Sequence, residues 1–361
     1  MKLNQKNLSI GIGNTVNQNI LQIDGNDSNL QSCVLYGNHK DSPRSRLQLE
    51  SNIDLDDVLI DTSEFKKKLI LSQKWIKKAQ NKDDFGLPTD DIGSKSCSWS
   101  SAGLLWSSWL IDGKTYDWWL KCLRWVISQS NSDNGIPIVI RGDHSITDAT
   151  AFTLMCSSVE CNQFCNAANN MCDWILDMQN NGGWKWRSDA ENYNFVSTGL
   201  ALLSLKVYYN MIGKNKERIG HAIKNGLSFL INNRNLDGGW GGFPDDISRP
   251  ANTGFVTYVL AAMGQKKQAI ESQEYLESKF ISSIGWYNST DRPASHNVTR
   301  LGVPYSLIGL SSISSSNKQL LKSGFDILIS RFNNGVYELP ETVARSWPTR
   351  DFIFACSSII A

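Results

Sequence analysis

An excess of charge of one sign is what this sequence most clearly lacks. Its 361 residues include 36 basic and 35 acidic ones, so the formal net charge is +1. That balance gives no electrostatic footprint for nucleic acid or for an anionic membrane. No apolar run reaches the length of a bilayer span, and the opening MKLNQKNLSIGIGN lacks a signal-peptide core. These absences predict a soluble cytoplasmic protein with no nucleic-acid partner and no membrane span.

Standard metal and redox patterns are missing as well. The eight cysteines lie mostly in apolar, helix-like stretches, which is typical of buried free thiols. Cys161, Cys165 and Cys172 are spaced for one helical face, but this is not a standard zinc spacing. The sequence therefore predicts no metal and no cofactor.

What the sequence does contain is tryptophan, thirteen residues of it, and an internal repeat. Turns that combine glycine with asparagine or an aromatic residue recur along the chain at separations of 49, 48, 56, 46 and 50 residues. A fixed period of this length is typical of repeat architectures. The anchoring glycines are Gly86, Gly135, Gly183, Gly239, Gly285 and Gly335.

Each repeat has the same order of parts. An amphipathic helix, such as 63–80 or 216–233, leads into the turn, and a nearly apolar helix follows the next loop. Amphipathic helices belong outside and apolar ones inside, so six such pairs predict an all-α toroid over residues 61–361. The expected inner helices are 98–110, 145–158, 195–209, 251–264, 298–312 and 349–361.

The turn NLDGGWGGFPDD, residues 235–246, illustrates the repeat. Its glycines are expected to end the outer helix, with Gly239 at a positive φ angle. Trp240 is expected to pack between repeats, where a buried indole ring adds several kcal/mol. We therefore interpret this segment as structural.

Residues 1–60 differ in kind, because they are rich in Asn, Gln and Ser and lack helical periodicity. GIGN at 11–14 is not a dinucleotide-binding fingerprint, since no strand and helix flank it. The segments 8–13 and 19–24 alternate and could pair as a hairpin. A flexible or partner-docking extension is an equal alternative.

Two of the turns carry a family resemblance. WILDMQNNGGW and FLINNRNLDGGW resemble the QW motif of terpenoid cyclases and protein prenyltransferase β-subunits. The sequence keeps Trp75-Ile76 with Gln80, and Trp174-Ile175 with Gln179, although the second copy is one residue short. Arg234 and Arg331 replace Gln in other repeats. The resemblance covers residues 63–361 and implies the α/α-toroid fold, but it is much less specific for chemistry.

The resemblance allows three reactions to be compared residue by residue. The zinc ligands of prenyltransferases fall on Asn252, Gly254 and Phe354, which cannot hold zinc. The D-x-D-D-T motif of class II cyclases falls on SITDATA, where only Asp148 and Thr150 match; an N-cap is the alternative role for Asp148. The zinc site of lanthionine cyclases needs Cys and His together, and no inner segment has both.

Parallel inner helices would gather their N-termini, with their partial positive charge, at one mouth of the toroid. Solvated loops with salt bridges across repeats are the alternative reading of the charged residues expected there. These are Asp90, Asp91, Arg141, Asp143, His144, Asp148, Asp245, Asp246, Arg249, His296, Arg300, Arg345, Arg350 and Asp351.

Our leading hypothesis is a binding module that holds a ligand or a partner segment at this mouth. The expected ligand contacts are Arg249, Arg300, Arg350, His144, His296, Asp143, Trp99 and Phe255. Three guanidiniums opening successive inner helices predict a phosphate-bearing or carboxylate ligand.

The alternatives are a scaffold and a divergent terpenoid cyclase or prenyl-diphosphate-using enzyme. In the enzyme, Asp148 is the general acid, Asp351 is a second candidate, and the same arginines hold the diphosphate. An isoprenoid-like ligand is favoured if the centre is an apolar cavity lined by Trp99, Trp106, Phe195, Phe255, Tyr258 and Phe352.

Overall fold

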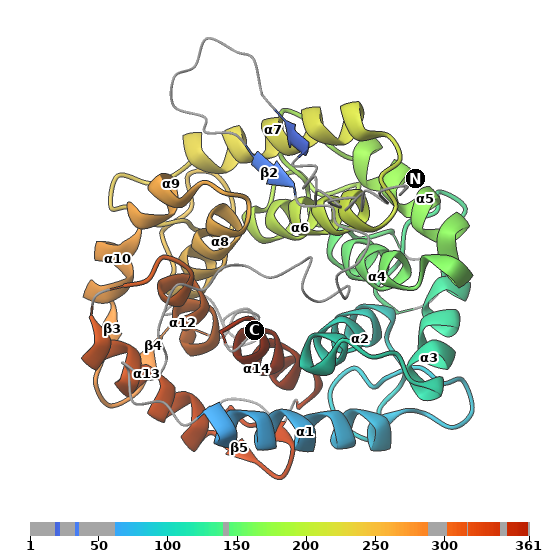
Figure 1. Cartoon of the computed structure of the whole chain (residues 1–361), viewed down its shortest axis with the longest axis horizontal. Coiled ribbons are helices and arrows are strands. Elements are labelled where there is room, and N and C mark those ends of the chain that lie inside the picture. The colour runs from blue at the N-terminus through green and yellow to red at the C-terminus, as the bar shows by residue number, and fades with distance from the viewer. Residues whose placement is uncertain are drawn as a thin grey trace, which may run out of the picture.

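Two concentric rings of helices make up the computed structural model (Figure 1). It describes residues 19–21, 33–35, 62–139, 144–287, 302–315, 317–339 and 345–359. The outer ring contains α1 (Thr62–Ala79), α3 (Asp117–Ser128), α5 (Cys161–Asp177), α7 (Lys216–Asn232), α9 (Lys266–Ile270), α10 (Gln273–Ser278) and α13 (Lys318–Ser330). The inner ring contains α2 (Ser98–Asp112), α4 (Thr147–Val159), α6 (Phe195–Met211), α8 (Pro250–Ala262), α12 (Gly302–Ser312) and α14 (Ser346–Ile359). The predicted all-α toroid is confirmed.

The inner ring closes on itself. Each inner helix contacts the next, and α14 returns to contact α2 (Figure 1). Backbone bonds join the last loop to the first, because the N–H groups of Arg345 and Ser346 donate to the Asp90 carbonyl at 2.7 and 2.8 Å. Arg345 also pairs with Asp91 at 3.6 Å. No repeat is therefore left at an exposed end of the ring.

Composition explains which helices lie inside. Every residue of α8 is buried, whereas the amphipathic α1 buries one face through residues such as Phe65 and Leu69. Some hydroxyl groups on inner helices are satisfied locally: Thr153 and Thr257 donate to the carbonyls of Ala149 and Thr253 at 2.7 and 2.8 Å. Small hydroxyl residues therefore pack inside without leaving these polar groups unpaired.

An Asp–Gly–Ser arrangement shapes three of the turns. In one of them, the Asp133 carboxylate accepts from Gly135 N at 2.9 Å and from Ser145 Oγ at 2.8 Å. Asp84 and Asp237 make the corresponding bonds in their own turns. These aspartates therefore hold the loops in shape.

A hydroxyl on the inner helix secures the residue after the anchoring glycine. Thr150 Oγ1 accepts from Ile136 N at 2.9 Å and donates to Ile146 O at 2.8 Å. The same bond to the turn is made by Ser101, Thr198 and Thr253. Thr349 instead accepts from Tyr337, the second residue after Gly335. Thr150 therefore belongs to the repeat, and its match to a cyclase motif has a structural explanation.

The buried tryptophans after the glycines tie each turn to the outer helix before it. Trp240 is 1% exposed, which confirms its predicted burial. Its indole Nε1 donates to Leu230 O at 2.8 Å, and Trp184 and Trp286 donate likewise to the carbonyls of Ile175 and Leu276. The glutamines also link repeats, since Gln80 and Gln179 each donate to carbonyls of their own turn and of the next outer helix.

The predicted backbone role of Gly239 is wrong. The positive φ of this turn, +87°, falls on Gly238, and α7 has already ended at Asn232. Gly239 is needed for space, because a Cβ there would lie 2.6 Å from Ser248 Cβ. A tight approach to the serine of the Asp–Gly–Ser arrangement therefore selects glycine at this position.

The strands are short. Two of the turns form hairpins, β3 (Phe280–Ile281) with β4 (Gly285–Trp286) and β5 (Phe332–Asn333) with β6 (Val336–Tyr337). In the N-terminal region, β1 (Asn19–Leu21) pairs antiparallel with β2 (Cys33–Leu35), which contacts α6. Residues 19–24 were predicted to pair with residues 8–13, which lie outside the described residues; the observed partner is a different segment.

Candidate functional site

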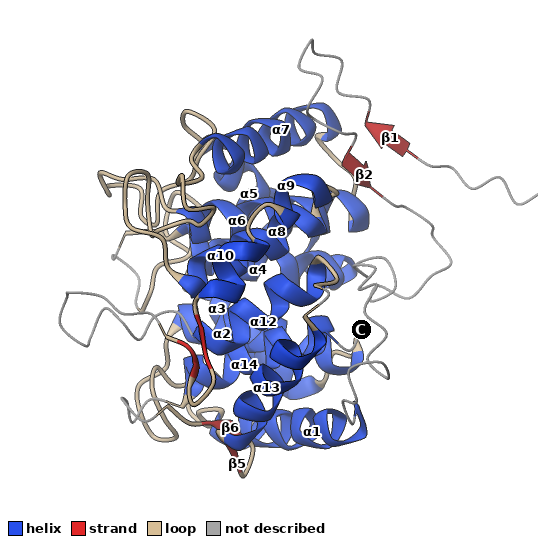
Figure 2. Ribbon diagram, turned by 90° about the vertical axis from the view of Figure 1, so that its left-hand side faces the viewer, coloured by secondary structure: helices blue, strands red, loops and turns tan. Residues whose placement is uncertain are grey.

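All six inner helices begin at the same face of the ring, the mouth, where the long loops gather on the left of Figure 2. The first two turns of five of them supply the side chains described below, which are buried except for the partly buried Trp99. We refer to these residues as the polar cluster: Trp99, Asp148, Ser197, Tyr305, Arg350 and Asp351. Ser197 and Tyr305 were not predicted.

Asp148 joins two inner helices. It is the second residue of α4, 2% exposed, and accepts a hydrogen bond of 2.6 Å from Ser197 Oγ of α6. The N-cap of α4 is Ile146, so the alternative role of Asp148 as an N-cap is wrong. A buried carboxyl bonded to a neutral hydroxyl can serve as a ligand contact or as a proton donor.

Arg350 and Asp351 form a buried ion pair. Arg350 Nε donates to Asp351 Oδ1 at 2.7 Å, and Tyr305 OH donates to the same oxygen at 2.9 Å. Burial opposes the charged guanidinium, but the charge of Asp351, helped by Tyr305 and Asp148, outweighs it and raises the pKa of Arg350. The arginine therefore stays ionised throughout the physiological range.

Aromatic rings hold the guanidinium in place. The Arg350 Cζ lies 4.5 Å from the Trp99 ring centroid and 5.8 Å from that of Phe152. Its stem crosses α2 at Gly103, where any Cβ would collide with Arg350 Cδ. The glycine on α2 thus makes room for a buried arginine that reaches across from α14.

Three shielded polar atoms of this cluster have no hydrogen-bond partner among the described residues: Arg350 Nη1, Asp351 Oδ2 and Trp99 Nε1. Burying such an atom without a partner costs about 1–3 kcal/mol. Native proteins therefore rarely do so without reason, and an unsatisfied group that lies in a polar cluster points to recognition. Two donors and one acceptor are available here.

Arg249 has a different surrounding. Both of its terminal nitrogens bond to Asp246, and the second of these bonds measures 3.1 Å. Gly242 N also donates to Asp246 at 2.7 Å. Burial opposes ionisation of this carboxyl, but the Arg249 and Gly242 bonds outweigh it, and the pKa of Asp246 is lowered.

These pairs revise the predicted anion site. Arg249 and Arg350 each form an ion pair with a carboxylate, so neither is the unpaired guanidinium expected at the mouth. Arg300, the third arginine, lies outside the described residues, as do Asp143 and His296. His144 is more than half exposed and lies 3.4 Å from Asp189 of the next loop, away from the polar cluster.

The positions compared with the prenyltransferase zinc ligands have other roles. Asn252 Nδ2 donates to Gly241 O at 2.7 Å. Gly254 lies directly on α12, where a Cβ would collide with the Tyr305 carbonyl, so a cysteine could not be placed there. Phe354 packs against Phe255. The described residues include no group of three or more His, Cys, Asp or Glu side chains placed to hold a metal.

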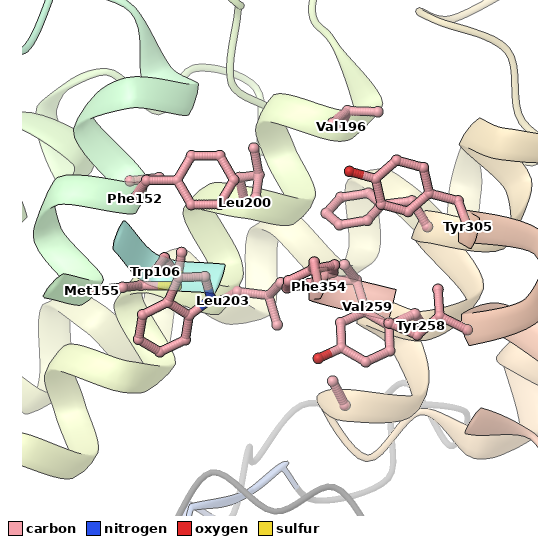
Figure 3. Close-up of a cluster of buried hydrophobic side chains, with 14 of the residues drawn as sticks. Trp106, Phe152, Met155, Val196, Leu200, Leu203, Tyr258, Val259, Tyr305 and Phe354 are labelled. Atoms are coloured by element: carbon pink, nitrogen blue, oxygen red, sulfur yellow. The ribbon is translucent and has the colours of Figure 1, made fainter. Parts of the chain in front are cut away.

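Apolar side chains line the axis of the ring below the polar cluster. Figure 3 shows Phe152, Leu203 and Trp106 facing Tyr305, Phe354 and Tyr258 across the centre. These six retain 4–9% exposure, whereas core residues behind them, such as Leu154, Leu202 and Ile353, are fully buried. The axial side chains are therefore slightly exposed, as are some core residues of the outer helices, such as Trp75 and Phe229.

The predicted lining was only partly correct. Trp106 and Tyr258 lie on the axis (Figure 3). Phe195 and Phe352 point outward, because their rings contact Phe229 of α7 and Phe332 of β5. Phe255 is 1% exposed, behind Tyr305 and Phe354. Two axial residues that were not predicted, Phe152 and Met155, could have been identified from the helix period. They follow Asp148 at the i+4 and i+7 spacing of one helix face.

Comparison with known proteins supports the fold and does not show a family. No family model matches the chain, and no curated protein matches it in sequence. A β-1,3-1,4-glucanase from Paenibacillus sp. X4 is similar in structure, with a TM-score of 0.63 and 11% identity over 83% of this chain and 93% of the glucanase. The α-1,6-mannanase GH76A of Salegentibacter sp. HEL1_6 gives 0.60 and 10% over 82% and 98%.

A third similar structure belongs to a different class of enzyme. The ent-copalyl diphosphate synthase of Streptomyces platensis has a TM-score of 0.52 and 14% identity over 73% of this chain and 49% of the synthase. Glycosidases and a diphosphate synthase thus share the toroid. At these identities the likeness shows the fold alone.

One mannanase structure is described as an inactive variant in which two consecutive aspartates are replaced by asparagine. This chain has three such aspartate pairs in its mouth loops: 83–84, in which Asp84 holds its turn in shape, and 90–91 and 245–246. One member of each pair is engaged, since Asp91 pairs with Arg345 and Asp246 with Arg249.

Proposed function

We propose that this protein binds a small, mainly apolar molecule along the axis of its toroid, with the polar end of that molecule at the mouth. The proposal includes no zinc-dependent prenyl transfer. One observation carries it: the axial side chains retain exposure directly below a polar cluster with three unsatisfied, shielded atoms. A ligand with an apolar body and a polar head satisfies both features at once.

The body of the ligand is expected to be isoprenoid-like. Aromatic and branched aliphatic side chains such as Phe152, Leu203 and Phe354 suit a flexible hydrocarbon and offer it no hydrogen bond. The resemblance of the turns to terpenoid cyclases and the structural likeness to a copalyl diphosphate synthase support the same class of ligand.

The head of the ligand is expected to be neutral. The polar cluster has one guanidinium, Arg350, and two carboxyl groups, Asp148 and Asp351, so a diphosphate would meet as much repulsion as attraction. A hydroxyl or carbonyl oxygen can accept from Arg350 Nη1 and Trp99 Nε1, and a hydroxyl can also donate to Asp351 Oδ2. We therefore favour an alcohol over the phosphate-bearing ligand predicted from sequence.

Binding of geranylgeraniol and of geranylgeranyl diphosphate, followed by isothermal titration calorimetry, tests this proposal. We expect the alcohol to bind and the diphosphate to bind at least tenfold more weakly. Leu203→Trp, which fills the axis, should abolish binding while the helical circular dichroism stays intact. Leu236→Trp, on a fully exposed loop position, is the matched control and should bind normally. Equal binding by both variants, or none by the wild type, contradicts the proposal.

A second candidate function is acid-catalysed cyclisation with Asp148 as the proton donor. The observation in its favour is the burial of Asp148 beside the axial aromatics, where it accepts a hydrogen bond from the neutral hydroxyl of Ser197. The carboxyl proton would move to an alkene carbon, and the resulting cation would lose a proton to water as the product forms. Gas chromatography of extracts after incubation with geranylgeranyl diphosphate tests this, with Asp148→Asn expected to abolish the cyclic product.

A further inference from the structure

The outer face of α1 concentrates positive charge that the overall composition conceals. The whole chain carries +1, yet α1 alone has six lysines and one glutamate. That glutamate, Glu64, pairs with Lys68 at 3.4 Å. The remaining lysines of the helix are all exposed: Lys66, Lys67, Lys74, Lys77 and Lys78.

Two aliphatic residues lie among these lysines. Ile70 is 48% exposed and Leu71 is 44% exposed. Lys67, Ile70 and Lys74 follow one another at the spacing of a single helix face, and Leu71 lies beside them. The opposite side of α1 is buried in the core. We call the exposed residues Lys66, Lys67, Ile70, Leu71, Lys74, Lys77 and Lys78 the α1 face.

The other outer helices carry fewer lysines and arginines than α1, and several of these pair with carboxylates. In α3, Lys121 pairs with Asp117, and the basic Arg218 of α7 pairs with Asp173 and Asp177 of α5. In α13, Lys322 pairs with Asp326. The α1 face therefore differs from the rest of the described outer ring in having five exposed lysines and no carboxylate of its own beyond the paired Glu64.

We propose that the α1 face docks the toroid on the surface of an anionic lipid bilayer. The lysines would lie among the headgroups, and Ile70 and Leu71 would enter the boundary with the acyl chains. Both ribbon views place α1 at an edge of the ring, with its outer side directed away from the other helices (Figures 1 and 2). Such contact is peripheral, and no described helix is long and apolar enough to cross a membrane.

Shape and composition favour a membrane over an acidic peptide. A peptide that binds a helix usually needs a groove in which to bury its anchors. Ile70 and Leu71 instead stand on the convex side of a single helix, between lysines. A planar, deformable anionic surface can contact all of these side chains together, and the lysine stems can extend to reach the headgroups.

Flotation with vesicles of phosphatidylcholine alone, or with 30 mol% phosphatidylserine, tests the proposal at 0.1 M NaCl. We expect the wild-type protein to float only with the anionic vesicles, and to float less as salt rises. The triple variant Lys67→Gln, Lys74→Gln, Lys78→Gln should lower the partition coefficient by roughly a hundredfold. The variant Ile70→Ser with Leu71→Ser should remove the binding that persists at high salt.

A matched control removes the same charge elsewhere. Lys266, Lys267 and Lys318 are exposed on other outer helices, and replacing them with Gln should leave flotation near the wild-type level. Equal loss in the two triple variants would show that net charge alone matters and would overturn the proposal. So would equal flotation with both lipid mixtures. Saturable binding of polyglutamate through the α1 face, without vesicle binding, would identify an acidic protein partner instead.

Discussion

Polar side chains of the inner helices in this toroid have two kinds of role: some bond the turn of each repeat, and others belong to the candidate site. Thr150 illustrates the distinction, because it matches a cyclase motif in sequence but bonds the turn backbone, as Thr198 and Thr253 do. Asp148, two residues earlier, has no such repeated role and bonds across to α6. Comparing equivalent positions between repeats thus separates structural residues from candidate functional ones.

Replacing Trp240 with alanine should reduce the free energy of unfolding by roughly 3–5 kcal/mol. The ring is 1% exposed, and the substitution also leaves the Leu230 carbonyl without the indole donor. Chemical denaturation of the variant measures the change. Trp186→Ala is the control, because Trp186 is 36% exposed and its loss should change stability little. Equal effects would show that burial between repeats is not what Trp240 contributes.

Asp246 makes stability depend on pH. Its pKa is lowered in the folded protein, so its contribution is present above the unfolded value near about 4 and is lost as pH falls through the folded value. Asp246→Asn should therefore destabilise by about 1–3 kcal/mol at pH 7, with the difference shrinking at acidic pH. Urea unfolding at several pH values measures this. Asp245→Asn, on an exposed neighbour, should have no such pH-dependent effect.

At the scale of the elements, the sequence pattern predicted helices better than it predicted their faces. The expected helices at 63–80, 98–110 and 195–209 agree closely with α1, α2 and α6. The axial lining was harder, because a helix that is apolar all round shows its inward side only through an occasional polar residue such as Asp148. Phe195 and Phe352 were misplaced for that reason. Asp351 was expected to neutralise the arginines only partly; its close pairing with the adjacent Arg350, and the bond that Tyr305 of α12 adds, came from the packed structure.

The contact between α8 and α12 depends on two glycines. A Cβ at Gly254 would collide with the Tyr305 carbonyl, and one at Gly309 would lie 2.6 Å from the Gly254 carbonyl. Gly254→Ala should force these helices apart and destabilise by about 1–3 kcal/mol or more. Thermal melting followed by circular dichroism measures it. An unchanged melting temperature would mean that the two backbones are not in contact.

At the scale of the whole molecule, we predict that residues 61–361 fold as one unit that requires its last helix. A protein ending at residue 339 lacks α14 and exposes the sides of α2 and α12 that it covers. It should bind the dye ANS and lose its cooperative thermal transition. A protein beginning at residue 61 should melt cooperatively and leave the dye unbound. If the first truncation melts like the full chain, closure of the ring is not needed for folding.

Closure of the ring also has a consequence during synthesis. Ser346 Oγ donates to the Asp90 carbonyl across 256 residues of chain. One side of α2 packs against α14, which is the last inner helix in the chain. At a translation rate of about 5–20 residues per second, the first inner helix waits roughly 13–50 s for its final neighbour. During that interval the nascent chain forms an incomplete ring whose apolar edge is exposed. Chaperones and neighbouring nascent chains can bind this edge until α14 has been synthesised and packs against it.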